Sequence, residues 1–163
     1  MESVLLKVNK NPRLCKFLRL ISHLTGILAF ILYLSTFVLT LLSSALGALK
    51  LLIILGVSYV LVSIFRKKIN APRPYELYDF YELPPKSKRG VSFPSRHVFL
   101  VFAISTLCFP LLPLPSIILL LFAVMQAVSR VLLGIHFIRD VVCGALLGVL
   151  SSVIGLLVLF PYI

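Results

Sequence analysis

The chain has 163 residues, of which 60% are hydrophobic and 13% charged, and sixteen Lys and Arg against five Asp and Glu give a formal charge of +11. Soluble domains carry about a quarter charged residues, and disordered chains are poor in apolar ones, so both classes are excluded. A mean hydropathy of +1.11 also argues against a nucleic-acid-binding protein. The positive charge therefore requires a membrane explanation.

Five apolar stretches approach the length of about 20 helical residues that a bilayer core of about 30 Å requires. They cover approximately 21–42, 45–65, 97–112, 115–133 and 141–160. The first is too long for a signal peptide and lacks a cleavage site. Ser43 and Ser44 allow only a tight hairpin after it, and Pro110, Pro113 and Pro115 predict a turn between the third and fourth stretches.

Two polar segments accompany these spans. Residues 1–19 mix basic and apolar side chains, a pattern typical of an interfacial helix on anionic headgroups. Residues 66–96 contain eight basic side chains and form a long loop of the kind that usually carries function. The sequence thus predicts one all-α domain over 1–163, an integral membrane helical bundle of about five transmembrane helices with an N-terminal interfacial helix over 1–19 and an active-site loop over 66–96.

The basic residues are distributed unequally across the predicted membrane. With five spans, the N-terminus, the 66–96 loop and the 130–140 connection share one side, which holds fifteen of the sixteen basic residues. Lys50, in the first turn of the second span, is alone on the other side, where its side chain can snorkel to the interface. The positive-inside rule predicts a multi-pass cell-membrane protein with this basic face in the cytoplasm.

Several residues that often carry chemistry are interpreted as structural. Three cysteines are scattered without C-x-x-C spacing: Cys15, Cys108 and Cys143. Their number and spacing favour neither a disulfide framework nor a zinc site. His23 is also assigned a structural role. Gly144 and Gly148 form a G-x-x-x-G pattern that is expected to pack the last span within the bundle.

Three groups of ionisable residues at span ends fall on the same predicted face, and such residues are functional candidates because they are costly near a membrane. They are Arg66 with Arg73 and Pro74, then Pro94-Ser95-Arg96-His97, then Ser129-Arg130 with His136 and Asp140. Arginine binds phosphate through two parallel donors, and imidazole acts as nucleophile or acid near neutral pH. The combination favours phosphate chemistry.

The spacing within the third group suggests how it works. His136 and Asp140, four residues apart, are expected on one face of a helix, where the carboxylate fixes the imidazole tautomer and stabilises its cation. Arg130 and His136, six apart, would face apart on a continuous helix, and Gly134 offers the break that brings them together.

The second group is expected at the start of a helix. Ser95 has the position of an N-cap, and a helix N-terminus is a natural phosphate site. His97, in the first turn, is placed to act as an acid. Each residue alone also has an ordinary interpretation: a packed interfacial histidine, a headgroup anchor, or an Asp140 paired with Arg139 or Arg130. The joint spacing favours the site.

In this order the motifs resemble the signature of the type 2 phosphatidic acid phosphatase family, K-x6-R-P, P-S-G-H and S-R-x5-H-x3-D. Here they read RKKINAPRP over 66–74, PSRH over 94–97 and SRVLLGIHFIRD over 129–140. Two positions depart from the family pattern: Arg66 replaces its lysine, for which Lys67 is a possible substitute, and Arg96 replaces its glycine. Arg96 adds a cation that either tightens binding of a more charged headgroup, such as a diphosphate, or restricts access.

The resemblance implies roles for these residues. His136 would be the nucleophile that forms a phosphohistidine, Asp140 its orienting group, and His97 the acid for the leaving group. Phosphoryl oxygens would be bound by Arg73, Arg130 and Ser95, with the cations of Arg66, Lys67 and Arg96 nearby. The resemblance implies no metal and no cofactor, and the sequence has no carboxylate cluster for magnesium.

The leading hypothesis is a membrane lipid phosphatase that hydrolyses a phosphomonoester or diphosphate of a lipid. The substrate would be an anionic phospholipid or a polyprenyl phosphate, with phosphatidate, phosphatidylglycerol phosphate, a polyprenyl diphosphate and a phosphorylated glycolipid as candidates. Alternatives are a lipid phosphotransferase of the same family and a non-catalytic binder or transporter of lipid phosphates.

Overall fold

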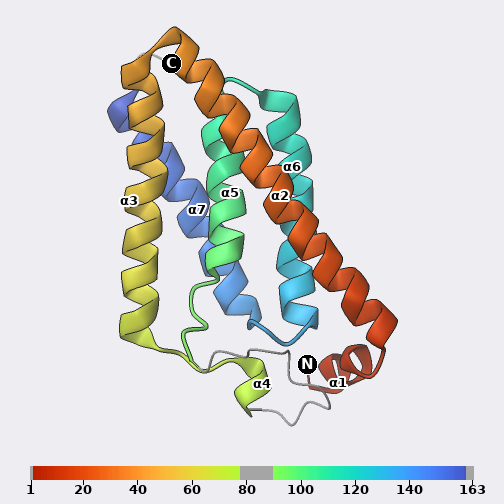
Figure 1. Ribbon diagram of the computed structural model, residues 1–163. Helices are drawn as coiled ribbons and strands as arrows, with labels where there is room; N and C mark the ends of the chain where they lie inside the picture. The colour runs from red at the N-terminus through yellow and green to blue at the C-terminus, as the bar shows by residue number, and fades with distance from the viewer. Residues whose placement is uncertain (1, 78–89, 161–163) are drawn as a thin grey trace.

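The computed structural model describes residues 2–77 and 90–160, with side chains from residue 5 onward, as an all-helical bundle (Figure 1). Its helices are α1 (Glu2–Asn9), α2 (Pro12–Ser43), α3 (Ala45–Ile69), α4 (Pro74–Leu77), α5 (Arg96–Cys108), α6 (Pro113–Leu132) and α7 (Ile138–Leu159). The five longer helices run alongside one another, and α1 and α4 lie together at one end. The predicted all-α membrane bundle is confirmed.

Among the described residues, α2, α3, α6 and α7 belong to segments long and apolar enough to cross a membrane. Their outer faces are rich in exposed aliphatic side chains, such as Leu42 (80% exposed) and Leu157 (69% exposed). Exposed apolar surface of this extent suits contact with lipid rather than water. The chain is therefore a multi-pass membrane protein.

Helix α5 is shorter than the predicted third span. Its thirteen residues extend only about 20 Å, and it ends at Cys108, two residues before Pro110, which has no backbone N–H to continue the helical hydrogen bonds. It lies in the middle of the bundle (Figure 1), where Val98 and Phe99 are 0% exposed. A helix enclosed by protein does not need to match the full thickness of the bilayer.

The N-terminal helix is also shorter than predicted. The expected interfacial helix over 1–19 is divided into α1 and the first turns of α2, so residues 12–19 belong to a spanning helix. The break is set by Asn11, whose side chain accepts hydrogen bonds from the backbone of Arg13 (3.1 Å) and Leu14 (3.2 Å), with Pro12 at the first helical position. Both are strong helix-start signals.

The cysteines, the hairpin after α2 and Lys50 agree with the sequence-based predictions. All three cysteines are free, and the Cys15 thiol contacts the carbonyl of Val8, 3.4 Å away. Ser44 caps α3 by accepting a hydrogen bond from Gly47 at 3.1 Å, which produces the expected tight hairpin. Lys50 lies near the start of α3, and this end of α3 is opposite α1 (Figure 1); its Nζ lies 5.1 Å from the centroid of the Phe160 ring.

Glycines on α7 allow it to lie against α5. A Cβ atom added at Gly144 would lie 2.6 Å from the Ser95 carbonyl oxygen, and one at Gly148 would lie 2.5 Å from that of Phe99. Neither backbone oxygen can move without shifting α5. The predicted packing role of the G-x-x-x-G pattern is confirmed, and this contact fixes the start of α5 beside the start of α7.

Gly148→Ala should destabilise the protein by about 1–3 kcal/mol, because the added methyl group overpacks a rigid contact. The measurement is the unfolding midpoint in detergent. Gly56→Ala on α3 is the matched control, since its Cβ would meet nothing within 4 Å and alanine favours helix more than glycine does. Equal midpoints for wild type and Gly148→Ala would contradict the packing argument.

Candidate active site

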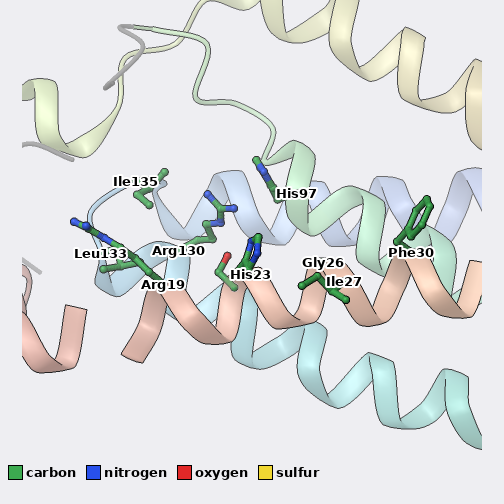
Figure 2. A pocket seen from close by; sticks show the side chains of 10 residues that line it. Arg19, His23, Gly26, Ile27, Phe30, His97, Arg130, Leu133 and Ile135 are labelled. Carbon is green, nitrogen blue, oxygen red and sulfur yellow. The ribbon is translucent and has the colours of Figure 1, made fainter. Parts of the chain in front are cut away.

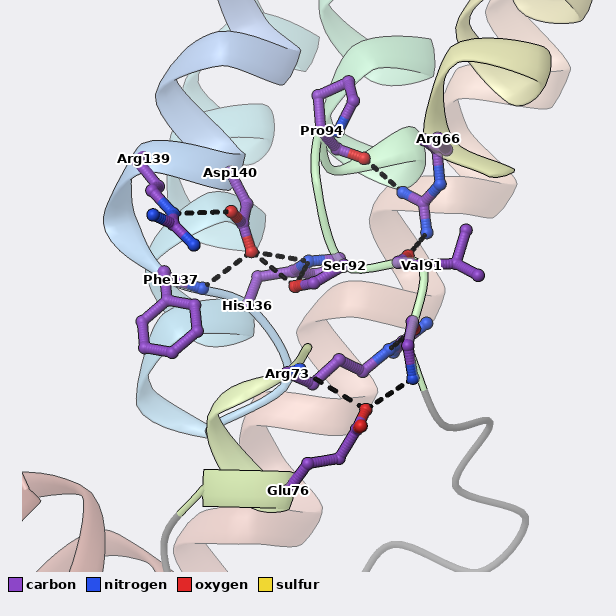
Figure 3. Close-up of polar contacts among 11 residues, drawn as sticks. Arg66, Arg73, Glu76, Val91, Ser92, Pro94, His136, Phe137, Arg139 and Asp140 are labelled. Carbon is purple, nitrogen blue, oxygen red and sulfur yellow. Dashed lines mark hydrogen bonds and ion pairs between the residues drawn. The ribbon is translucent and has the colours of Figure 1, made fainter. Parts of the chain in front are cut away.

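The three motif groups converge at the end of the bundle that carries α1 and α4. Arg66 and Arg73 come from the end of α3 and the segment after it, while His136 and Asp140 come from the start of α7 and the residues before it (Figure 3). His97, in the first turn of α5, and Arg130, in the last turn of α6, line one cavity (Figure 2). The predicted convergence is thus observed for these residues.

A turn centred on Gly134 brings His136 back toward Arg130. Helix α6 ends at Leu132, and Gly134 has a φ of +67°, a conformation that glycine adopts at no steric cost. The carbonyl of Arg130 then accepts hydrogen bonds from the backbone of Ile135 (3.1 Å) and His136 (3.3 Å). The predicted helix break at Gly134 is confirmed.

His136 and Asp140 meet, although not for the predicted reason. His136 precedes α7, while Asp140 lies in its first turn, so the expectation that both occupy one helix face is wrong. Asp140 Oδ2 lies 3.5 Å from His136 Nδ1 and accepts the backbone N–H of Phe137 at 3.0 Å. This carboxylate at the helix N-terminus both caps α7 and binds the imidazole.

Ser92 joins the pair and was missed by the sequence analysis. Its hydroxyl lies 3.2 Å from His136 Nδ1 and donates to Asp140 Oδ2 at 2.5 Å (Figure 3). The exposed fraction is 2% for His136 and 0% for Asp140 and Ser92. The Nδ1 side of the ring is therefore occupied by acceptors, which favours a proton on Nδ1 and leaves the lone pair on Nε2.

His136 lies outside the spanning helices, and its burial lowers its pKa from 6.5 to about 4. Asp140 opposes this shift through its hydrogen bond, while the positive charges of Arg130 and Arg73 add to it. The pKa lies well below neutrality, so His136 is neutral at pH 7. An imidazole with a free lone pair is the form that acts as a nucleophile.

NMR of histidine-labelled protein in detergent should show His136 neutral, with its proton on Nδ1, as the pH falls from 8 past 6.5, and titrating only near pH 4. Burial penalises the charged form, so protonation requires more acid than for a free histidine. The His136→Ala variant assigns the signal. A titration near 6.5 would contradict the burial argument.

Two of the predicted phosphate ligands, Arg66 and Lys67, are directed to other surroundings. Arg66 is buried and donates to the carbonyls of Val91 and Pro94, so it positions the segment before α5. Lys67 is exposed. The hydrogen bonds to Val91 and Pro94 come from Arg66 instead. The hypothesis that Lys67 substitutes for the family's lysine gains no support from this arrangement.

Arg73 and Arg96 lie against neighbouring groups. Arg73 Nε donates to the Gly90 carbonyl at 3.1 Å. The carboxylate of Glu76 accepts the backbone N–H groups of Arg73 (3.3 Å) and Gly90 (2.6 Å), which ties the two sides of the loop together. The guanidinium carbon of Arg96 lies 5.3 Å from the centroid of the Tyr59 ring, a cation–π contact with α3.

Two of the predicted phosphate ligands have a buried donor without a hydrogen-bond partner in the described part of the chain. Ser95 stands at the N-cap position of α5, but its hydroxyl makes no capping hydrogen bond, and neither its Oγ nor Arg130 Nε has a hydrogen-bond partner. Buried polar atoms are normally paired. Unpaired donors at the site end of α5 and α6 therefore suit an anionic ligand.

The alternative pairing of Asp140 with Arg139 is also present in the structure. Arg139 Nε lies 3.6 Å from Asp140 Oδ1, but the Arg139 side chain is 66% exposed. Oδ2, in contrast, binds the buried side chains of His136 and Ser92 and the backbone N–H of Phe137. The two oxygens of Asp140 thus have separate partners, and the Arg139 pair does not replace the His136 contact.

A cavity of about 450 Å³ opens beside the site (Figure 2). His97, Arg130, Leu133 and Ile135 form one side, and α2 contributes Arg19, Ser22, His23, Gly26, Ile27 and Phe30. His23, interpreted from sequence as structural, thus lies in the wall of this cavity together with Arg19. The one sequence signal for this was the spacing of Arg19 and His23, which are four residues apart near the start of the first predicted span and so share one face of a helix.

The membrane-crossing helices bring arginines, two histidines and a buried Asp–His pair together at one end. This combination defines a lipid phosphatase-like class of membrane protein. The chain belongs to the PAP2 superfamily, whose family model matches residues 47–162. This identification confirms the resemblance drawn from the three motifs.

Two solved structures share the fold. LpxE from Aquifex aeolicus is 28% identical with a TM-score of 0.72, and the match covers 94% of this chain and 93% of LpxE. The transmembrane PAP2-type phosphatidylglycerolphosphate phosphatase from Bacillus subtilis is 26% identical with a TM-score of 0.68, covering 94% and 83%. The bacitracin transport permease protein BcrC from Bacillus licheniformis is 43% identical over 61 residues, which are 37% of this chain and only 30% of that relative.

Proposed function

We propose that this protein hydrolyses a phosphomonoester or diphosphate of a membrane lipid through a phosphohistidine on His136. The observation that carries the proposal is the divided environment of the site. His136 Nδ1 faces Asp140 and Ser92, while the buried donors Ser95 Oγ and Arg130 Nε have no partner in the described chain. Such an arrangement combines an oriented nucleophile with free donors for phosphoryl oxygens.

In the first step, Nε2 of His136 attacks phosphorus in line, and the bond from phosphorus to the leaving oxygen breaks. Arg130 and Ser95 stabilise the charge on the phosphoryl oxygens, and His97 protonates the leaving oxygen. Asp140 stabilises the imidazolium character that develops at His136. In the second step, His97 accepts a proton from water, whose oxygen attacks phosphorus, releases phosphate and restores His136.

The test is phosphate release by the purified protein in mixed micelles. The panel contains phosphatidate, phosphatidylglycerol phosphate, a polyprenyl diphosphate and a phosphorylated glycolipid, and radiolabelled substrate allows a phosphoenzyme to be trapped under alkaline conditions. At least one lipid should give steady release with a trapped intermediate. Release from none of them would refute the proposal.

The proposed reaction uses side chains rather than a metal ion to stabilise the phosphoryl charge, because arginines supply the cationic donors. Adding EDTA to the same assay should therefore change the rate by less than about twofold. The control is readdition of Mg²⁺ to the chelated sample. Loss of activity in EDTA with recovery on Mg²⁺ would contradict metal independence.

A second candidate function is transport or binding of a lipid phosphate without hydrolysis. It is favoured by one observation, that the relative BcrC is named a transport permease. The phosphate-release panel discriminates between the two, since a binder retains its lipid intact. A phosphotransferase would release less phosphate when a lipid alcohol is added, and the transferred product would be detected by mass spectrometry.

We further propose that the site faces the cytoplasm and that residues 1–163 act as one domain. The charge asymmetry supports the orientation, since only Lys50 among sixteen basic residues is expected on the opposite side. Residues 78–89 of the proposed active-site loop lie outside the described residues. A reporter inserted in this loop should give a cytoplasmic signal, and a signal from the other side would reverse the assignment.

A further inference from the structure

One face of α2 changes from cationic to apolar along the cavity. The residues on this face fall at positions i, i+3, i+4, i+7, i+8 and i+11, as expected for one side of a helix: Arg19, Ser22, His23, Gly26, Ile27 and Phe30. From Arg19 to Phe30 the helix rises about 16 Å. The cationic end lies toward the N-terminal end of α2, and the apolar end lies farther along the helix at Ile27 and Phe30 (Figure 2).

This face contributes hydrogen-bond donors, including the cation of Arg19, that the phosphoryl site does not use. Arg19 and His23 are exposed to the cavity that also contains His97 and Arg130. No carboxylate belongs to the ten lining residues, and the Ser22 hydroxyl is buried without a hydrogen-bond partner in the described chain. None of the three α2 residues belongs to a motif of the proposed reaction. A general headgroup anchor would need only an exposed position at the membrane surface, whereas these residues line one cavity together with His97 and Arg130.

Two groups of donors therefore lie in or next to the cavity. Arg130 lines it on the side of His136, with the buried Ser95 outside its lining, and Arg19 with His23 line it from α2. Beyond them, Gly26 leaves open space within 4 Å of where a Cβ would be, and Ile27 and Phe30 continue the wall. The order of these features matches a lipid whose headgroup carries two anionic groups next to a hydrocarbon chain.

We propose that Arg19 and His23 form a second anion subsite, which binds the lipid-proximal phosphate of a lipid diphosphate while the terminal phosphate lies at His136. This inference rests on the proposed function and specifies its substrate class. In the first step the bond from Nε2 to the terminal phosphorus forms and the bridging P–O bond breaks. The bridging oxygen leaves with the lipid monophosphate, whose charge Arg19 stabilises.

The test compares a monophosphate and a diphosphate of the same polyprenyl chain. Arg19→Ala and His23→Ala should each raise KM for the diphosphate about tenfold, since each removes a charge-assisted hydrogen bond, and should change kcat/KM for the monophosphate less than about twofold. Lys16→Ala is the matched control, because Lys16 is exposed on α2 and does not line the cavity. Arg19→Lys should restore most of the diphosphate preference.

A binding measurement keeps the inference testable if no substrate is hydrolysed. The probes are a polyprenyl methylenebisphosphonate and the corresponding monophosphonate, titrated into wild type and Arg19→Ala in the same detergent. Arg19→Ala should weaken only the bisphosphonate, by about tenfold. Equal weakening of both probes, or of neither, would overturn the subsite, whereas absent hydrolysis with selective weakening would refute only the proposed function. Thermal unfolding midpoints confirm that each variant is folded.

Discussion

Replacing His136 with alanine should abolish phosphate release, lowering kcat by at least about 10³-fold and leaving no phosphoenzyme to trap. The proposed intermediate is a bond between Nε2 of this histidine and phosphorus, and alanine provides no atom to replace it. Steady-state release and alkaline trapping of radiolabelled protein measure the two effects. Residual activity should not exceed what bound water achieves with Arg130 and Ser95 still in place.

His97→Ala is the variant that separates the two histidines. Its activity should fall with natural lipids, because the leaving oxygen has no proton donor, but phosphate binding should persist. With a substrate whose leaving group needs no protonation, His97→Ala should still form a phosphoenzyme, whereas His136→Ala should not. A trapped phosphoenzyme in His136→Ala, or full activity in either variant, would contradict the assigned roles.

The positions of the spanning helices were predictable because long apolar runs have few other uses in a chain of this composition. The boundaries were less predictable. The basic residues between 12 and 19 obscured the start of α2, although Asn11 followed by Pro12 is a recognisable helix start. The length of α5 depends on its enclosure by the other helices, which is a property of packing rather than of the local sequence.

The residues of the candidate site were predictable from spacing, but their contacts were not. The three motifs indicated His97, Arg130, His136 and Asp140, and Gly134 indicated the turn. The roles of Ser92 and Arg66 depend on the path of the segment before α5, which has no periodic pattern. Arg19 and His23 enter the cavity only because α2 packs beside α5 and α6, a tertiary arrangement that no local signal reveals.

Asp140→Asn should lower kcat by about 10²–10⁴-fold, a range guided by the equivalent change in a serine protease triad. The amide can donate a hydrogen bond to Nδ1, which would move the ring proton to Nε2 and remove the lone pair that attacks phosphorus. The variant also loses the charge that stabilises the phosphorylated ring. Single-turnover phosphorylation measures the rate, and histidine NMR shows whether the proton has moved from Nδ1.

Two neighbouring variants distinguish control of the tautomer from general loss of charge. Arg139→Ala removes an exposed cation 3.6 Å from Asp140 Oδ1 and should change kcat less than about threefold, because surface ion pairs contribute little. Ser92→Ala removes the hydroxyl that donates to Oδ2 but keeps the carboxylate, so its loss should be intermediate, about tenfold. An equal loss in Arg139→Ala and Asp140→Asn would show that charge at Oδ1, rather than the orientation of His136, limits the reaction.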